Sequence, residues 1–337
     1  MITSNRRPTS YDVAVKAGVS QSAVSRCFRP GSSIAPATRA KVLAAAAALN
    51  YRPNAIASGL ITKRTGLVAV IISSLTNLYY PEVLFELTRR LSEHNLRVLL
   101  FALDVEHEIE AVLEQVWRFR VDGVIAAAQL RPEQLREFAQ NRLPVILYNR
   151  LGEGELVPSV CCDSVSGERQ LVDQLVQSGH KRFGLIGGPE DNTVGRERIR
   201  GARARLDALG LTSHVVAGSF DYESGKRGLA ELLSQTERAI DAIICANDLM
   251  AIGALDAARQ DFGLNVPRDL SIVGFDGVGP GQWSSYRLTT VRQPVRQMTE
   301  AAVAMLVERI ADPDLPPEVR NFAGKLLRGQ TARMAAT

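Results

Sequence analysis

The sequence changes character close to residue 65. The chain has 337 residues, with 40 lysines and arginines against 36 aspartates and glutamates. Ten of the basic residues but only one acidic residue, Asp12, lie in the first 64, which leaves 30 basic and 35 acidic residues for the rest. A small, strongly basic module therefore precedes a mildly acidic body, and a chain of this length is expected to form two or three domains. Such a module is typical of a region that binds a polyanion.

Composition restricts the class of protein. The sequence has no run approaching about 18 apolar residues, so no membrane span is predicted. Arginines near the N-terminus have no apolar segment behind them, so no secretory signal is predicted either. The four cysteines show no zinc-binding or C-x-x-C spacing, and the adjacent Cys161 and Cys162 are interpreted as buried strand residues. We expect a cytoplasmic protein that needs no metal or cofactor.

The basic module is patterned as a helix-turn-helix. Thr9 and Asp12 can form a capping box at the start of a first helix, and Gly18 can end that helix in a tight turn. Ser20 can cap a second helix, Gln21–Phe28, which in such a motif is able to enter the major groove of DNA. Any small three-helix bundle with a solvated basic face would show the same local pattern, so the pattern alone leaves both alternatives open.

Five short motifs in this module resemble the head of the LacI/GalR family of bacterial transcription regulators. In order, they are Tyr11-Asp12-Val13-Ala14, Ala17-Gly18-Val19-Ser20, Val24-Ser25-Arg26, Thr38-Arg39 and Asn50-Tyr51-Arg52-Pro53-Asn54. The resemblance implies that Gln21, Ser22 and Arg26 read bases, and Arg26 suits guanine because a guanidinium can donate two bonds to O6 and N7. The residues that it implies at DNA are Tyr11, Ser20, Gln21, Ser22, Ser25, Arg26, Asn54, Ala57 and Leu60. Family members often carry a serine cap where this chain has Ala35, so a third helix from Pro36 should start less firmly.

Residues 54–65 form a candidate hinge. By themselves they favour a flexible linker, because the apolar face is small and Gly59 lowers helix propensity by about 1 kcal/mol. The resemblance implies instead a hinge helix that orders on operator DNA, where two copies pair in the minor groove. Leu60 then has the position of an intercalating leucine, which kinks the duplex by partly unstacking a base step. Gly59 should raise the cost of ordering this helix.

From Gly66 onward, apolar runs alternate with amphipathic segments. This alternation predicts an α/β fold in which helices cover both faces of parallel sheets. Eight strands are expected, in two groups of four: Leu67–Ser73, Arg97–Ala102, Gly123–Ala127, Val145–Tyr148, Phe183–Gly187, His214–Ala217, Ala242–Cys245 and Leu270–Gly274. Helices are expected at Glu82–Glu93, Ile109–Arg118, Glu168–Gln177 and Leu249–Asp261, among others. Doubly wound sheets of this kind bind ligands at the carboxyl ends of their strands.

The resemblance extends along the chain and implies a periplasmic-binding-protein-like body of two doubly wound parallel-sheet subdomains. The expected organisation is an all-α helix-turn-helix head (1–53), a hinge (54–65) and an effector-binding and dimerisation domain (66–337). The resemblance implies that the chain crosses between subdomains near Asp163, returns near Val291–Pro294 and crosses again near Lys325. Subdomain one would then hold about 66–162 and 292–324, and subdomain two about 163–291 and 325–337.

Polar residues at the ends of the expected strands form a candidate ligand site. Carboxylates, carboxamides and a guanidinium can together satisfy the vicinal hydroxyls of a sugar, although asparagine and aspartate in such places can equally cap the following helices. The resemblance favours a ligand: Arg198, Asn247 and Asp276 match effector-contacting positions, and Asn149 and Phe220 match more loosely. The full set of candidates is Ser73, Asn77, Tyr79, Asn149, Arg198, Phe220, Asn247 and Asp276. Because Asn149-Arg150 stands where relatives carry an acidic residue, the identity of the ligand stays open.

These observations predict a sequence-specific transcription regulator, a repressor, that binds double-stranded operator DNA as a homodimer and responds to a sugar-like effector. No leucine-heptad tail follows the last expected strand, so we expect a dimer rather than a tail-held tetramer. A solute-binding protein with the same body would need an export signal and no helix-turn-helix. A sugar-modifying enzyme would need a nucleophile or base constellation, and the sequence contains no such motif.

Overall fold

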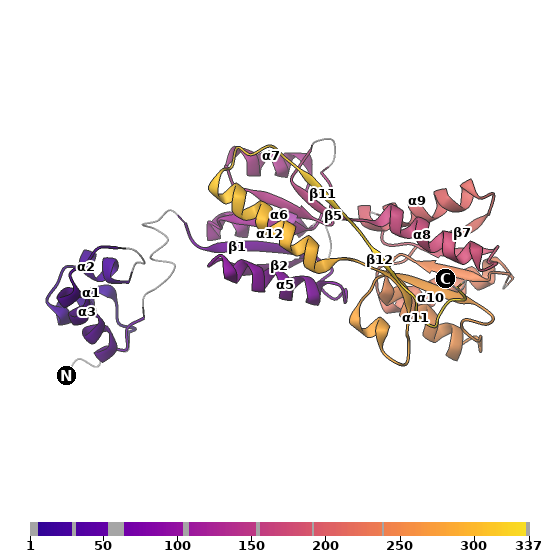
Figure 1. The fold of residues 1–337 in the computed structure, drawn as a ribbon, viewed down its shortest axis with the longest axis horizontal. Coiled ribbons are helices and arrows are strands. Elements are labelled where there is room, and N and C mark those ends of the chain that lie inside the picture. Colours follow the sequence, from indigo (N-terminus) through magenta and orange to yellow (C-terminus); the bar gives the residue numbers. More distant parts are fainter. Residues whose placement is uncertain are drawn as a thin grey trace. The chain divides into compact units, whose positions relative to one another are not determined.

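The chain consists of two compact units. The computed structural model describes residues 6–28, 32–52, 64–103, 108–152, 156–190, 192–237 and 239–334. The units are Met1–Gly66 and Leu67–Thr337, and Figure 1 shows the fold of each. The division falls where the charge and the hydrophobic pattern of the sequence change. Of the residues expected at DNA, Asn54, Ala57 and Leu60 lie outside the described residues.

The described part of the first unit contains three helices, α1 (Ser10–Ala17), α2 (Gln21–Cys27) and α3 (Pro36–Ala48). One valine from each helix, Val13, Val24 and Val42, is fully buried at their common centre. Three of the other four buried residues of this core are alanines, so the helices approach closely, and larger partly buried side chains such as Phe28 and Leu49 pack around them. The unit is therefore the small helical bundle that the motif spacing predicts.

The predicted helix caps are present. The Thr9 hydroxyl accepts a hydrogen bond from the Asp12 amide (3.4 Å), and the Asp12 carboxylate accepts one from the Thr9 amide (2.8 Å). Gly18 ends α1 in the left-handed conformation, with φ of 64°, which glycine adopts without the cost of a side chain. The Ser20 hydroxyl caps α2, whereas α3 has no side-chain cap at Ala35. The local signals in the sequence thus fix where these helices begin and end.

The described part of the second unit contains twelve strands. They are β1 (Leu67–Ser73), β2 (Arg97–Leu103), β3 (Gly123–Ala127), β4 (Val145–Tyr148), β5 (Ser159–Asp163), β6 (Phe183–Ile186), β7 (Ser213–Val216), β8 (Ala242–Cys245), β9 (Ser271–Asp276), β10 (Thr289–Arg292), β11 (Val319–Ala323) and β12 (Lys325–Leu327). They form two sheets, ordered β11-β5-β4-β3-β1-β2 and β12-β10-β9-β8-β6-β7. Every neighbouring pair is parallel except β10 and β12. The expected α/β architecture of two parallel-sheet subdomains is confirmed.

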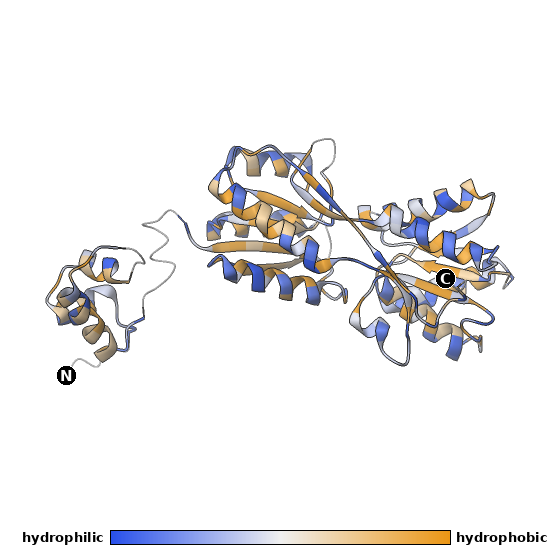
Figure 2. Cartoon of the chain, viewed as in Figure 1, coloured by the Kyte–Doolittle hydropathy of each residue, from blue (hydrophilic) through white to orange (hydrophobic). Residues whose placement is uncertain are grey.

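Helices cover both faces of each sheet. They are α5 (Tyr80–Glu93), α6 (Ile109–Phe119), α7 (Pro132–Gln140), α8 (Ser164–Gln177), α9 (Thr193–Ala208), α10 (Tyr222–Gln235), α11 (Asp248–Gln260) and α12 (Val295–Ala311). Along β1, Val68 and Val70 pack with α5 and α12, while Ala69 and Ile71 pack with α6 and α7. In the second sheet, α8 and α9 cover one face and α10 and α11 the other. Strands buried on both faces have to be apolar throughout. Figure 2 shows hydrophobic residues, coloured orange, concentrated in both sheets.

The chain passes between the two sheets three times. After β5 it leaves the first sheet and continues through α8 into the second. From β10 it returns to α12, which packs on the first sheet, and Gly324 alone separates β11 of the first sheet from β12 of the second. None of the helices in the described ranges combines the length and the apolarity needed to cross a membrane.

The prediction of eight strands in two groups of four is wrong, because each sheet has six. The eight expected strands do not include β5, β10, β11 and β12, although two cysteines of β5 are interpreted as strand residues. In β10 three of the four side chains are polar, and β11 and β12 are half-exposed edge strands, so none of the three shows a continuous apolar run. Cys161 and Cys162 do lie buried in a strand, as expected. The expected helices are present, and the largest difference is the start of α8 at Ser164 rather than Glu168.

Candidate ligand-binding cleft and nucleic-acid interface

The residues expected to read DNA lie on an exposed surface of α1 and α2. Tyr11, Ser20, Gln21, Ser22, Ser25 and Arg26 are all exposed. Gln21 donates to the Ser10 hydroxyl (3.2 Å), and the hydroxyls of Ser20 and Ser22 are 2.9 Å apart. The guanidinium of Arg26, in contrast, makes no hydrogen bond or ion pair with any described residue. Among these candidates it is the long side chain that can reach a base edge without giving up a contact in the unit.

Arg39 fixes the position of α2 on α3. Its guanidinium donates to the Cys27 carbonyl at the end of α2 (3.1 Å), and the Cys27 thiol lies 3.9 Å from the Arg39 carbonyl. Because α2 is only seven residues long, its direction depends on such contacts with its neighbours rather than on its own stability. The contacts with α3 therefore hold the exposed face of α2 in a fixed orientation within the unit.

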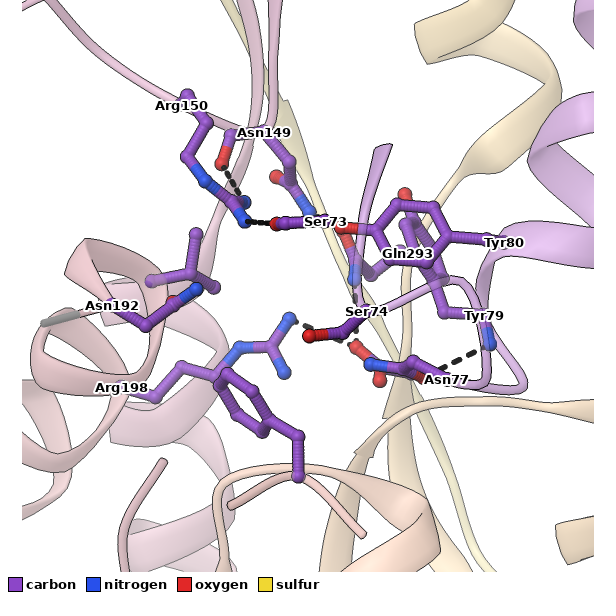
Figure 3. A pocket seen from close by; sticks show the side chains of 13 residues that line it. Ser73, Ser74, Asn77, Tyr79, Tyr80, Asn149, Arg150, Asn192, Arg198 and Gln293 are labelled. Carbon is purple, nitrogen blue, oxygen red and sulfur yellow. Dashed lines mark hydrogen bonds and ion pairs between the residues drawn. The ribbon is translucent and has the colours of Figure 1, made fainter. Parts of the chain in front are cut away.

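A polar cleft lies at the carboxyl ends of both sheets in the second unit. Figure 3 shows its side chains pointing toward one another from strand ends, from the loops that follow them and from the first turns of helices. It is lined by Ser73, Ser74, Asn77, Tyr79, Tyr80, Asn149, Arg150, Asn192, Val194, Arg198, Phe220, Asp276 and Gln293. Seven of the eight candidates from the sequence are among them, and Asn247 is the exception. This is the place where parallel α/β sheets bind ligands.

Arg198, on α9, is the central cation of the cleft. Its terminal nitrogens donate to the Ala246 carbonyl (2.6 Å) and to Asp276 (2.9 Å), and its guanidinium lies 4.0 Å from the centre of the Phe275 ring. Burial raises the pKa of Asp276, and the charge of Arg198 opposes that shift. The pair presents a carboxylate and a guanidinium side by side, which suits a ligand with neighbouring hydroxyl groups.

Gln293 connects the two sheets across the cleft. Its amide nitrogen donates to Asp276 (2.8 Å), and its amide oxygen accepts from Asn149 (2.8 Å), which in turn accepts from the Cys162 amide (3.0 Å). The cavity between these groups has a volume of only about 30 Å³, enough for about two water molecules. Asp276, Gln293 and Asn149 therefore bond one another, and a larger ligand has to replace some of these bonds.

A side chamber adjoins the central cavity. It has a volume of about 250 Å³ and shares Asn149, Arg150 and Val194 with the cleft; its other lining residues are Leu151, Gly152, Cys161, Cys162, Ser164, Thr193 and Glu197. Arg150 donates to the Asn149 carbonyl (3.0 Å) and to the Ser73 hydroxyl (3.3 Å), so it ties two strand ends of the first sheet together. Burial raises the pKa of Tyr79 and of Tyr148, whose hydroxyls are 3.2 Å apart. This tyrosine pair stays neutral, and Tyr79 of the pair lines the central cleft.

Asn247 stands behind the cleft rather than in it. Its side chain accepts from the Met250 amide (2.9 Å) and so caps α11, which is the capping role that the sequence analysis leaves open. It also donates to the Phe220 carbonyl (3.0 Å). Phe220 has φ of 60°, a conformation that a phenylalanine adopts only when neighbours hold it. Asn247 therefore supports the position of Phe220, which does line the cleft.

Sequence reasoning does not select Gln293, Asn192 or Arg150 as cleft residues. Gln293 follows β10, a strand that the apolar pattern does not reveal, so its place at a strand end is hidden. Asn192 could have been found more easily than Gln293, because an asparagine before a helix is a recognisable cap. In the structure it caps α9 by accepting a hydrogen bond from the Gly195 amide (3.1 Å). In the described ranges, no group of three histidine, cysteine, aspartate or glutamate side chains could hold a metal ion.

Both units are similar to known protein families. Residues 9–54 match the model described as bacterial regulatory proteins, lacI family, and residues 172–332 match the periplasmic binding protein-like domain. Catabolite control protein A of Priestia megaterium is 32% identical over 306 residues, which cover 89% of this chain and 92% of that protein.

Two solved structures are similar over nearly the whole chain. A complex of the transcriptional regulator CelR with cellobiose has a TM-score of 0.73 at 30% identity, and the match covers 97% of this chain and 100% of that one. The lac repressor dimer bound to operator and the anti-inducer ONPF has a TM-score of 0.86 at 26% identity, with coverage of 98% and 100%. These similarities include both the helical unit and the two-sheet unit.

Proposed function

Because this chain belongs to the lacI family of bacterial regulatory proteins and is a DNA-binding transcription regulator, we propose that it acts as a homodimeric repressor controlled by a sugar-like effector. The head, residues 1–53, binds half of a near-palindromic operator. Residues 54–65 form the hinge, and residues 66–337 bind the effector and dimerise, with one subdomain at about 66–162 and 292–324 and the other at about 163–291 and 325–337. The protein works in the cytoplasm, where the chromosome is accessible.

The DNA-binding part of the proposal is supported by the exposed face of α2. Arg26 reads a guanine, because its guanidinium is exposed and makes no contact with described residues that DNA binding would have to break. Tyr11, Ser20, Gln21, Ser22 and Ser25 surround it. The similarity to a lac repressor dimer solved on operator supports the same use of this face. In the hinge, Asn54 and Ala57 contact the minor groove and Leu60 enters a base step.

The effector part of the proposal is carried by the chain of hydrogen bonds from Arg198 through Asp276 and Gln293 to Asn149. These groups come from both sheets and bond one another around a very small cavity. A ligand with neighbouring hydroxyls can replace these bonds one for one, while Phe220 offers a ring on which a sugar can stack. A similar protein solved with cellobiose supports a sugar as the ligand class.

Coupling between the two functions follows from where the cleft lies. Its residues belong to both sheets, so a ligand that needs more room changes the relation of the two subdomains. Such a change alters hinge pairing, and with it operator affinity, by the difference in ligand affinity between the two arrangements. Ser73 ends β1, and Asn77 and Tyr79 follow it, so these three cleft residues connect the change to the strand that follows the hinge in the sequence.

The test begins with selection of operator sites from a random duplex library by the full chain. Palindromic sites with a fixed half-site spacing are expected. Fluorescence anisotropy then measures affinity for the selected site while a panel of monosaccharides, disaccharides and sugar phosphates is added. At least one sugar should change the affinity by about 5–150-fold, the usual range of coupling. Recovery of sites without two-fold symmetry, or a response only to ligands without hydroxyl groups, would contradict the proposal.

A further inference from the structure

Glu168, on α8, is a buried acid without a partner. Its side chain is 1% exposed, and neither carboxylate oxygen has a hydrogen-bond partner in the described part of the chain. An ionised carboxylate in such a place loses its hydration and gains nothing in return, so it takes up a proton instead. Glu168 does not line the cleft, so it is not positioned to contact a ligand there.

The packing places Glu168 behind Arg198. A Cβ built on Gly201, one turn along α9 from Arg198, would lie 3.5 Å from the Cβ of Glu168. The preceding residue, Gly167, is so close to Phe275 that a Cβ there would lie 2.9 Å from the ring, and Arg198 stacks on that same ring at 4.0 Å. The absence of side chains at both glycines is what lets α8 approach this site closely.

The charges in this region do not balance. Two further carboxyl groups, Glu168 and Asp248, are buried near Asp276, and the guanidinium of Arg198 is the cation that opposes the pKa shifts of Glu168 and Asp276. Asp276 takes the ion pair, and Asp248 accepts hydrogen bonds from the Val278 amide (2.8 Å) and the Thr290 hydroxyl (2.5 Å). Glu168 is left with neither. Burial, reinforced by the negative charge of Asp276, raises the pKa of Glu168 to about 8, and the charge of Arg198 opposes the shift.

No other described cation competes for Glu168. The elements packed against α8 are α9, β10, β11 and β12. Their remaining basic residues are engaged elsewhere or exposed: Arg205 pairs with Asp173 (2.6 Å), Arg292 with Glu82 (3.2 Å) and Arg320 with Glu318 (2.9 Å), and Arg196, Arg200, Arg203 and Lys325 are exposed. Cys245 is a further titratable group close enough to Glu168 for the two charges to interact. It is a buried thiol, and burial raises its pKa as well.

Arg198 has a vacant donor for a second partner. Its two terminal nitrogens are used, but its Nε is buried and makes no hydrogen bond with any described residue. We propose that Glu168 is the reserve counter-ion of Arg198: a neutral acid while Arg198 holds Asp276, and an anion paired with Arg198 when a ligand takes Asp276. The second half of this statement rests on the proposed effector site. The proton leaves the Glu168 carboxyl for solvent, and no other bond changes.

One consequence is that ligand binding releases a proton. A ligand that engages Asp276 should bind more tightly as the pH rises toward 8, by up to tenfold per pH unit, because the proton must leave for the new ion pair to form. Glu168 is a positioning residue in this account, since it acts through Arg198 and does not touch the ligand.

The experiment measures urea unfolding of the full chain between pH 5 and pH 9, without DNA or ligand. Glu168 has a folded-state pKa above its unfolded value, so its stabilising contribution is complete below about pH 4.5 and is lost as the pH rises through about 8. The unfolding constant of the wild type should therefore carry a component that grows up to tenfold per pH unit. Glu168→Gln should remove that component, whereas Glu223→Gln, at an exposed position of α10, should not. Identical pH profiles for the wild type and Glu168→Gln would overturn the proposal.

A second variant tests the reserve role itself. In Asp276→Asn, Arg198 loses its first counter-ion, so Glu168 should ionise and its pH-dependent component should disappear. Glu168→Gln should then raise the unfolding constant at pH 7 at least tenfold more in the Asp276→Asn background than in the wild type. Equal effects in both backgrounds would overturn the proposal. If Asp276→Asn does not fold, Arg198→Gln replaces it, and the Glu168 component should move to higher pH; an unmoved component would overturn the proposal. Neither result depends on operator or effector binding, so failure here is distinct from failure of the proposed function.

Discussion

Arg198 donates a hydrogen bond of 2.9 Å to Asp276, a residue 78 positions later in the chain, and both side chains are 3% exposed. The pair joins the first turns of α9 to the end of β9 at the floor of the cleft. Removing one partner of a buried pair leaves the other without compensation, at a cost of about 3–5 kcal/mol. For variants of this pair, protein stability and the response to ligand therefore have to be measured separately.

The first prediction concerns Arg26. Arg26→Ala should weaken operator binding by about 1–3 kcal/mol and relax base preference at one position of each half-site, because a bidentate contact to guanine is lost. Site selection followed by anisotropy measures both effects. Arg7→Ala is the matched control: it should weaken all sequences alike, as phosphate contacts do. Arg6 is less suitable, because it pairs with Asp12 (2.8 Å) at the cap of α1. An unchanged base preference for Arg26→Ala would contradict its role.

The second prediction separates the two units. A chain of residues 67–337 should fold and dimerise, because its cores contain no residue of the first unit. It should lose operator binding, since the basic module is absent. Circular dichroism and sedimentation check folding and assembly, and gel shift checks DNA binding. Operator binding by this fragment would show that the body, rather than the head, contacts DNA.

The third prediction concerns Asp248 and pH. Burial raises the pKa of this carboxyl to about 8, the negative charge of Asp276 adds to the shift, and the hydrogen bonds from Thr290 and from the backbone oppose it. Because the folded-state pKa is raised, the contribution of Asp248 to stability is complete below its unfolded pKa of about 4 and is lost as the pH rises through about 8. Asp248→Asn should flatten the pH profile of unfolding across that range, independently of Glu168. Parallel profiles for variant and wild type would show that Asp248 is ionised in the folded protein.

The sequence predicts the head better than the body, and the reason is physical. In the head, each boundary depends on a local signal: Thr9 and Asp12 cap α1, Gly18 ends it and Ser20 caps α2. Such signals act over three or four residues and can be read directly. In the body, β11 is held by a strand far away in the sequence, as when Val319 aligns with Ser159 of β5. Nothing local announces that pairing, so the sheets have more strands than the pattern indicates.

The same difference decides which cleft residues can be predicted. Asp276 ends β9 directly after an apolar run, and Asn149 follows the apolar strand β4, so their place at the cleft can be inferred. Gln293 follows the polar strand β10, and its role as the bridge between Asp276 and Asn149 emerges only from the fold. Asn247 has the right position in the chain, but its side chain caps α11, because an asparagine before a helix satisfies the free amides of the first turn.

The last prediction concerns the switch. Arg198→Ala and Asp276→Asn should each remove the response to effector while leaving operator binding intact, because both residues line the cleft and neither belongs to the head. A polar ligand group left without its partner costs about 1–3 kcal/mol or more. That is as large as the usual coupling between two sites, about 1–3 kcal/mol, so one lost contact is enough to silence the switch.

The control for these variants is Arg200→Ala, which removes an exposed arginine two residues further along α9 and should leave the response unchanged. Operator affinity is measured with and without effector, and urea unfolding shows whether each variant is folded under the conditions of the assay. If the effector is an inducer, the two cleft variants should repress permanently, and if it is a co-repressor, they should never repress. A full ligand response in both folded variants would place the effector site outside this cleft, since no ligand held by Arg198 and Asp276 could tolerate the loss of either.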